Sequence, residues 1–355
     1  MDLKKMQNKD TPIKDKMNIL SNEIKNIGDN FQANPENIAE FISFSSNFYN
    51  YSYRNTMLIY SQRPGAIFCA SFKKMKDLGY SVGKGEKGLK VLVPTITTLY
   101  RKSENSDWVK ISEATKEDKE KLKKGEFETR QIRNYKIGTT FDVTQTNCPT
   151  EDYPKLVGLG YSSEQHAKIY NAISKYANDV INCPVLTESL GSGLRGYFSP
   201  AENRIAINEM LQDTQKLSTL CHELGHAIIH NSIELDKPLY QIELEADCFS
   251  VMLERNFDIE LTDARKEHLA NHFKTTTEKA KQDDKQIGFD DIFKNVFEIY
   301  KEHIEEIEEY VNKELGIEFE QKNGLGSKTE KTKTTGAGFK SNIFNAKSDN
   351  EEIEL

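Results

Sequence analysis

The residues best suited to chemistry are two histidines and a glutamate in one short segment. His222 and His226 are four positions apart, so on a helix their rings lie one turn apart on the same face. Such a pair can hold one metal ion at about 2.0–2.1 Å from each ring nitrogen. Glu223 lies beside them, where a carboxylate can take a proton from metal-activated water. The spacing predicts a zinc-dependent hydrolase, although manganese and cobalt also suit such ligands.

A third protein ligand is required, and the segment 243–249 offers carboxylates on a predicted helix. We expect Glu243 to be that ligand. Asp247 follows four residues later and is expected to hydrogen-bond the far nitrogen of a ligand histidine, His222. Glu245 faces another side of the helix and is the alternative third ligand.

Several neighbours of the motif are expected to be structural. His230 is eight residues beyond His222, which turns it about 80° from the ligand face at 3.6 residues per turn. Cys221 and Cys248 fit apolar stripes and should lie in the core. Gly225 leaves room for a substrate or a facing element to come close.

Composition predicts two domains and a tail. The chain has 355 residues, of which 37% are hydrophobic, and it contains no apolar run of the roughly eighteen residues that a membrane span needs. Polar sequence rather than an apolar signal core follows the first six residues. The five cysteines lack CxxC spacing, which argues against a disulfide framework and a cysteine zinc ribbon. We therefore expect a soluble cytoplasmic protein with reduced thiols.

Charge is distributed unevenly between the two halves. Residues 1–150 contain 25 Lys and Arg against 18 Asp and Glu, whereas residues 151–355 contain 23 against 38. Within 51–102 there are ten basic residues and only two acidic ones. Ten aromatic residues also fall within 41–80, interleaved with cations. Aromatic faces and cations together are typical of single-stranded nucleic-acid binding, although helical spacing places several of these aromatics in the core.

Hydrophobic periodicity predicts an α+β fold. In the first half, helices are expected over 12–30, 36–50, 54–61 and 72–78, a strand over 89–99, an exposed hairpin or mobile excursion over 103–130, and a last strand over 141–146. In the second half, a helix is expected over 162–180, two short strands over 196–200 and 203–207, and helices to about 313. The expected domains are 1–150 and 160–315, with a disordered tail over 320–355.

The second half resembles the gluzincin-like metallopeptidase domain shared by the ImmA/IrrE group and by antirestriction proteins of the ArdC and LtrC type. The resemblance rests on His222-Glu-Leu-Gly-His226, on Glu243-x-Glu-Ala-Asp247 and on the preceding segment 196–205. It implies that an edge strand within 197–207 lines the cleft and can pair with an extended peptide.

The first half resembles the N-terminal domain of ArdC-like proteins, which implies binding of single-stranded DNA. The matching motifs are Asn50-x-x-x-Arg54-Asn55, Phe72-x(6)-Gly79, Val82-x-Lys84-Gly85-Glu86-Lys87-Gly88 and Phe141-Asp-Val-Thr-Gln145. Both resemblances follow the family order and together cover about residues 35–255. The candidate DNA-binding residues are Tyr53, Arg54, Asn55, Lys73, Lys84 and Lys87.

The leading hypothesis is a mobile-element protein that binds single-stranded DNA and carries a zinc metallopeptidase site acting on a protein or peptide. The resemblance implies protection of plasmid DNA from restriction during conjugation. One alternative is a protease that cleaves a repressor to regulate element transfer. Another is a non-catalytic DNA-binding antagonist with a structural metal.

Overall fold

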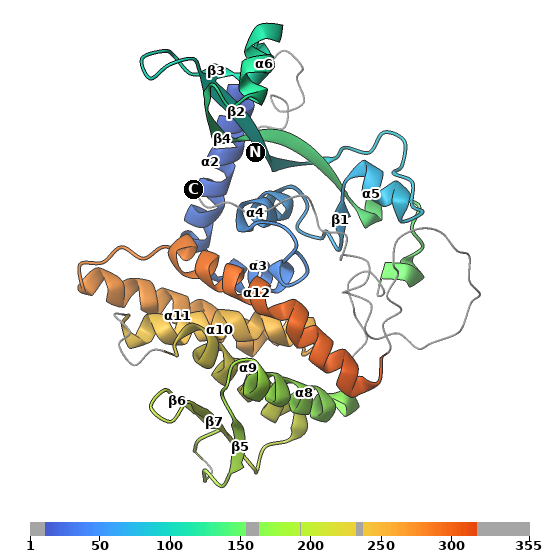
Figure 1. Ribbon diagram of the computed structural model, residues 1–355. Helices are drawn as coiled ribbons and strands as arrows, with labels where there is room; N and C mark the ends of the chain where they lie inside the picture. The colour runs from blue at the N-terminus through green and yellow to red at the C-terminus, as the bar shows by residue number, and fades with distance from the viewer. Residues whose placement is uncertain (1–10, 154–162, 192, 232–236, 318–355) are drawn as a thin grey trace.

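The computed structural model describes residues 11–153, 163–191, 193–231 and 237–317, which form the predicted α+β fold (Figure 1). The described part of the chain begins with the α-helices α2 (Ile13–Ala33), α3 (Ile38–Ser45) and α4 (Tyr53–Gln62). The Ser52 hydroxyl accepts a hydrogen bond from the Asn55 backbone N–H and so caps α4. Helices α2 and α4 lie near their predicted positions, whereas α3 ends at Ser45 rather than near residue 50.

A four-stranded antiparallel sheet follows, with the order β1-β4-β2-β3. Its strands are β1 (Cys69–Ala70), β2 (Leu89–Arg101), β3 (Val109–Lys110) and β4 (Glu128–Asp142), and α5 (Phe72–Asp77) follows β1. Strand β2 pairs with β4 along its whole length, and the two form the long curved ribbon at the top of Figure 1. Leu20 of α2 and Leu58 of α4 pack in one cluster with Leu92, which joins the ribbon to the helices.

The segment between β2 and β4 is folded rather than mobile. It contains β3, which pairs with β2 and fits the hairpin alternative, and α6 (Lys116–Lys123). The Tyr100 hydroxyl donates to Asp118 at 3.0 Å, and Lys102 lies 2.8 Å from the same carboxylate. These contacts hold the pKa of Asp118 low, at about 2, chiefly through the hydrogen bond from Lys102.

The strand expected over 141–146 is wrong in its position, because the observed strand ends at Asp142. Residues 143–145 form a 3-10 turn instead. The Asp142 carboxylate accepts hydrogen bonds from the backbone N–H groups of Ile67 and Phe68, while Gln145 bonds back to the Asp142 backbone. This side-chain capping ends the sheet pattern at Asp142.

The second half places a three-stranded sheet beside a bundle of helices. The elements are α8 (His166–Asp179), β5 (Val185–Glu188), β6 (Gly196–Ser199), β7 (Arg204–Asn208), α9 (Asp213–Ile229), α10 (Leu239–Asn256), α11 (Asp263–Gln282) and α12 (Phe289–Leu315). The sheet order is β5-β7-β6, with β5 parallel and β6 antiparallel to β7. Strand β6 is therefore an edge strand, and the central strand β7 leads from it to the motif helix α9. Strand β5 was not predicted from the sequence.

One hydrophobic core joins the first helices to the last. Phe289 of α12 packs 4.7 Å from Phe31 between ring centroids, and Phe293 lies 5.6 Å from Phe41. Figure 1 accordingly shows α12 between α3 and α4 on one side and α10 on the other. The predicted boundary over 147–160 falls partly on residues 154–162, which lie outside the described residues, as does the predicted tail over 320–355.

All five cysteines are buried and none forms a disulfide. The apolar spacing around Cys221 and Cys248 predicts the burial of these two. None of the helices in the described part of the chain has both the length and the apolar character of a membrane span.

Candidate metal centre

Two antiparallel-packed helices, α9 and α10, carry the candidate metal centre. Leu217, Leu220 and Leu224 are buried on one side of α9, which fixes the opposite face for the histidines. A Cβ added to Gly225 would lie 3.3 Å from the backbone of Ala246 on α10. Because Gly225 has no side chain, α9 and α10 can pack closely here. The facing element for which Gly225 was expected to leave space is therefore α10.

Three side chains bring their donor atoms together. The Nε2 atoms of His222 and His226 lie 3.2 Å apart, and Glu243 Oε2 lies 3.6 Å from the first and 3.7 Å from the second. Donors at about 2.0–2.1 Å from a tetrahedral ion would be separated by about 3.3–3.4 Å. The three atoms therefore outline one face of a tetrahedron of the right size for a divalent ion.

Charge also favours a cation at this place. Burial alone would lower the pKa of His222, but hydrogen bonds to Asp247 and Glu243 outweigh burial and raise it to about 10. Close contacts with His222 and His226 hold the pKa of Glu243 well below its usual range. Without a cation, a proton on His222 balances the carboxylates. A metal ion would replace that proton.

Asp247 contacts His222 on the side of the ring that faces away from Glu243. Its Oδ1 lies 3.3 Å from His222 Nδ1, so it fixes the ring with Nε2 directed at the metal position. The same Oδ1 accepts a hydrogen bond from Arg265 at 3.0 Å. Oδ2 faces His272 at 2.8 Å and His268 at 3.3 Å on α11.

His226 is supported by two residues in series, His230 and Glu245, which was not predicted from the sequence. Its Nδ1 lies 3.3 Å from Nδ1 of His230, and Nε2 of His230 lies 2.9 Å from Glu245 Oε2. Lys237 and Gln241 donate to the Glu245 carboxylate, which is only 1% exposed. Glu245 is thus directed away from the metal position, and the alternative that made it the third ligand is not supported.

Glu223 is 8% exposed, and its carboxyl group interacts electrostatically with His222, His226 and Glu243. Burial raises the pKa of its carboxyl group, and the two ligand histidines and a backbone hydrogen bond from Phe198 on β6 oppose that shift. A carboxylate with a raised pKa is a better proton acceptor near neutral pH. The hydrogen bond between Phe198 and Glu223 also holds the edge strand β6 next to the candidate metal centre.

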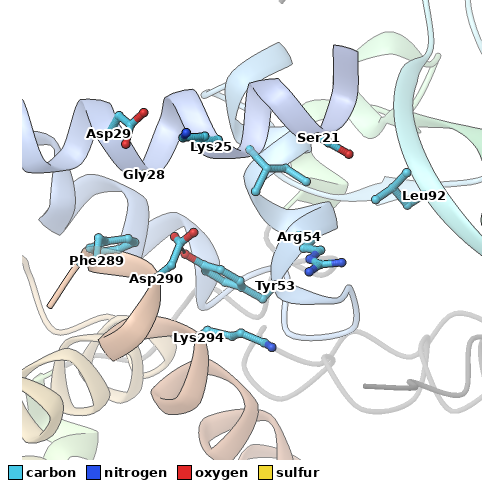
Figure 2. Close-up of a pocket in the computed structure, with 12 residues that line it drawn as sticks. Ser21, Lys25, Gly28, Asp29, Tyr53, Arg54, Leu92, Phe289, Asp290 and Lys294 are labelled. Carbon is cyan, nitrogen blue, oxygen red and sulfur yellow. Dashed lines mark hydrogen bonds between the residues drawn. The ribbon is translucent and has the colours of Figure 1, made fainter. Parts of the chain in front are cut away.

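The predicted DNA-binding residues divide into two groups. Arg54, Lys73, Lys84 and Lys87 are exposed. Arg54 lines a pocket with a cavity volume of about 430 Å3, together with Lys25 of α2 and Lys294 of α12. The same pocket is lined by Asp29 and Asp290, which Figure 2 also labels. Cations from three helices therefore line one pocket.

Tyr53 and Asn55 require a correction, because both side chains are buried and engaged. The Tyr53 hydroxyl donates to Asp290 at 2.5 Å, and its ring packs against Phe293. Asn55 exchanges two hydrogen bonds with the backbone of Leu92, at 2.8 and 2.9 Å, and so pins α4 to β2. In this fold the two residues stabilise the packing of the helices rather than offering contacts to DNA.

The fold and the candidate site define a metallopeptidase-like domain, in which a helix with two histidines and a glutamate packs against a helix that carries Glu243. Residues 179–282 match the IrrE N-terminal-like domain of the peptidase M78 type, and residues 16–141 match the N-terminal domain of anti-restriction factor ArdC. Together the two matches place an ArdC-type N-terminal domain before an IrrE-like domain, in the order that the sequence resemblance implies.

One relative is the uncharacterized protein pXO2-81 of Bacillus anthracis, which is 30% identical over 256 residues. The match covers 68% of this chain and 44% of the relative, so the chain spans less than half of that protein's length.

Two crystal structures of the antirestriction protein ArdC from plasmid R388 are also similar. The metal-free one is 19% identical and covers 74% of this chain and 86% of ArdC. The Mn(II)-bound one is 18% identical and covers 81% and 97%, and the TM-score is 0.43 for both.

Proposed function

We propose that the chain is an antirestriction protein of a mobile element that binds single-stranded DNA and hydrolyses a peptide bond at a zinc site. The observation that supports the hydrolase most strongly is the triangle of His222, His226 and Glu243 donor atoms, with sides of 3.2, 3.6 and 3.7 Å. Zinc suits two imidazoles and a carboxylate in this geometry.

Different residues of the chain have separate roles in the proposed hydrolysis. A bound zinc ion would supply the acidity that makes water a nucleophile near neutral pH. Glu223 takes the water proton on its buried carboxylate and returns it to the nitrogen of the leaving amine. Strand β6 is an edge of its sheet and can align an extended peptide by main-chain hydrogen bonds, with Phe198 next to Glu223.

Substitution of Glu223 by Gln tests the hydrolase. Gln keeps the shape of the side chain but cannot accept the proton, so we expect unchanged zinc content and a loss of peptide hydrolysis of about 100- to 10,000-fold. Glu209→Gln, an exposed carboxylate on the loop before α9, is the matched control. Full antirestriction activity in Glu223→Gln would show that the metal has a structural role.

DNA binding is proposed to occur through the exposed cations of the first half. Arg54 beside Lys25 and Lys294 forms one group, and Lys84 with Lys87 on the turn before β2 forms another. Phosphates attract such groups, and affinity then falls with salt in proportion to the number of contacts.

The double variant Arg54→Ala, Lys84→Ala tests this role with a fluorescent single-stranded oligonucleotide. We expect weaker binding and a slope of log affinity against log salt that is smaller by about 1.4, since two phosphate contacts are lost. Lys279→Ala, Lys281→Ala on α11 removes the same charge elsewhere and should change neither quantity. Equal slopes for the two double variants would exclude the proposed contacts.

A further inference from the structure

We propose that Asp247, His268 and His272 form a second binding site for a divalent transition-metal ion. This site goes beyond the proposed function, because it uses the carboxylate oxygen of Asp247 that does not face His222. His268 and His272 lie four residues apart on α11, so they repeat on a different helix the spacing of the two histidines on α9.

The donor atoms are already gathered. His272 Nδ1 lies 2.8 Å and His268 Nε2 lies 3.3 Å from Asp247 Oδ2, and all three donors are within 4.8 Å of one another. A tetrahedral zinc ion would separate its donors by about 3.3–3.4 Å. Small rotations of the histidine side chains would reach that geometry.

The donor chemistry is compatible with this assignment. One carboxylate and two imidazoles are ligand types that zinc and related divalent transition metals accept. Each neutral imidazole can move its proton to the other ring nitrogen, so it can become a ligand without net loss of a proton.

Access and charge set the strength of the site. The side chain of His268 is 60% exposed, that of His272 is 19% exposed and that of Asp247 is 4% exposed, so an ion can enter from the α11 side. Arg265 lies 3.0 Å from Asp247 Oδ1, and its positive charge opposes a cation nearby. The second ion should therefore bind more weakly than the first.

The two sites share one carboxylate. An ion at Oδ2 would draw negative charge from Asp247 and weaken the hydrogen bond from His222 Nδ1 to Oδ1. Filling the second site should then accelerate release of the first ion to a chelator.

Zinc titration of the metal-free full-length protein, followed by calorimetry and equilibrium dialysis, tests the proposal. We expect two equivalents in the wild type, one tight and one weaker. His268→Ala should leave the tight equivalent and raise the dissociation constant of the weaker one at least tenfold. Asn271→Ala, exposed on the same helix, is the matched control and should keep both.

A variant with both His222→Ala and His226→Ala separates this proposal from the first metal centre, because it should lose the tight equivalent and keep the weaker one. A wild type that binds a single equivalent would overturn the second site. A second equivalent that persists in His268→Ala, His272→Ala would also overturn it, since that ion would be adventitious.

Discussion

At the scale of single residues, each ligand histidine is backed by a carboxylate of α10. Asp247 contacts His222 directly, whereas Glu245 reaches His226 through His230. The first support follows from the sequence, because Asp247 lies four residues after Glu243. The second support was not predicted, because the angle around the helix axis was taken between His230 and His222. Between His230 and His226 that angle is only about 40° for four residues, which leaves the two rings in contact.

The support of His226 can be removed without leaving a cavity. His230→Phe keeps a ring of similar size but removes both nitrogens, so His226 loses its hydrogen-bond partner. We expect zinc affinity to fall about 10- to 100-fold, measured by competition with a chromogenic chelator. His303→Phe, on α12, is the control and should leave affinity unchanged. Equal affinities in the two variants would mean that His230 is only a packing residue.

Metal binding should depend on pH through His222. Without metal its pKa is raised to about 10, so the ring holds a proton at pH 7 that the ion must displace. Affinity should therefore rise with pH, by about tenfold per unit between pH 7 and 9 for one released proton. Calorimetry in buffers of different ionisation enthalpy counts the protons, and a count of zero at pH 7 would contradict this account.

At the scale of elements, α9 and α10 depend on close contact at Gly225. In Gly225→Val the new methyl groups would press on the Ala246 backbone and on the Phe249 ring, which lies 3.4 Å from the Cβ position. Overpacking of this kind costs about 1–3 kcal/mol, measurable by urea unfolding. Gly65→Val has open space around its Cβ and should change stability by less than about 0.5 kcal/mol. Similar losses in both variants would exclude the close contact as the cause.

The sequence predicts elements with a strong local pattern. The helices α2, α4, α8 and α9 and the strands β2, β6 and β7 lie near their expected positions. It did not predict the position of β4, because the exposed, charged residues of that strand gave little periodicity and its pairing with β2 is a long-range contact. Tyr53 and Asn55 were misassigned for a related reason: their partners Asp290 and Leu92 are distant in the chain.

At the scale of the whole molecule, the first helices and α12 share one core, although they belong to different halves of the sequence. Phe293 contacts Phe41 and Tyr53 across this junction. The halves should therefore unfold together. Fluorescence of Trp108, the single tryptophan, reports on the β3 region, and release of the metal reports on α9 and α10.

We expect the two probes to give the same urea midpoint in the wild type. Phe293→Ala should lower both midpoints, with a loss of about 3–5 kcal/mol for a buried aromatic residue. Tryptophan and metal signals that separate by a clear interval of urea in the wild type would instead indicate two independently folding units.

The metal content per chain, measured by mass spectrometry after purification without added metal, tests the metal centre most directly. We expect one zinc ion in the wild type and in the Glu245→Gln variant, and its loss in His222→Ala and in Glu243→Ala. A Glu243→Ala protein that keeps its zinc, or a wild type that contains no metal, would contradict the assignment of His222, His226 and Glu243 as the metal centre.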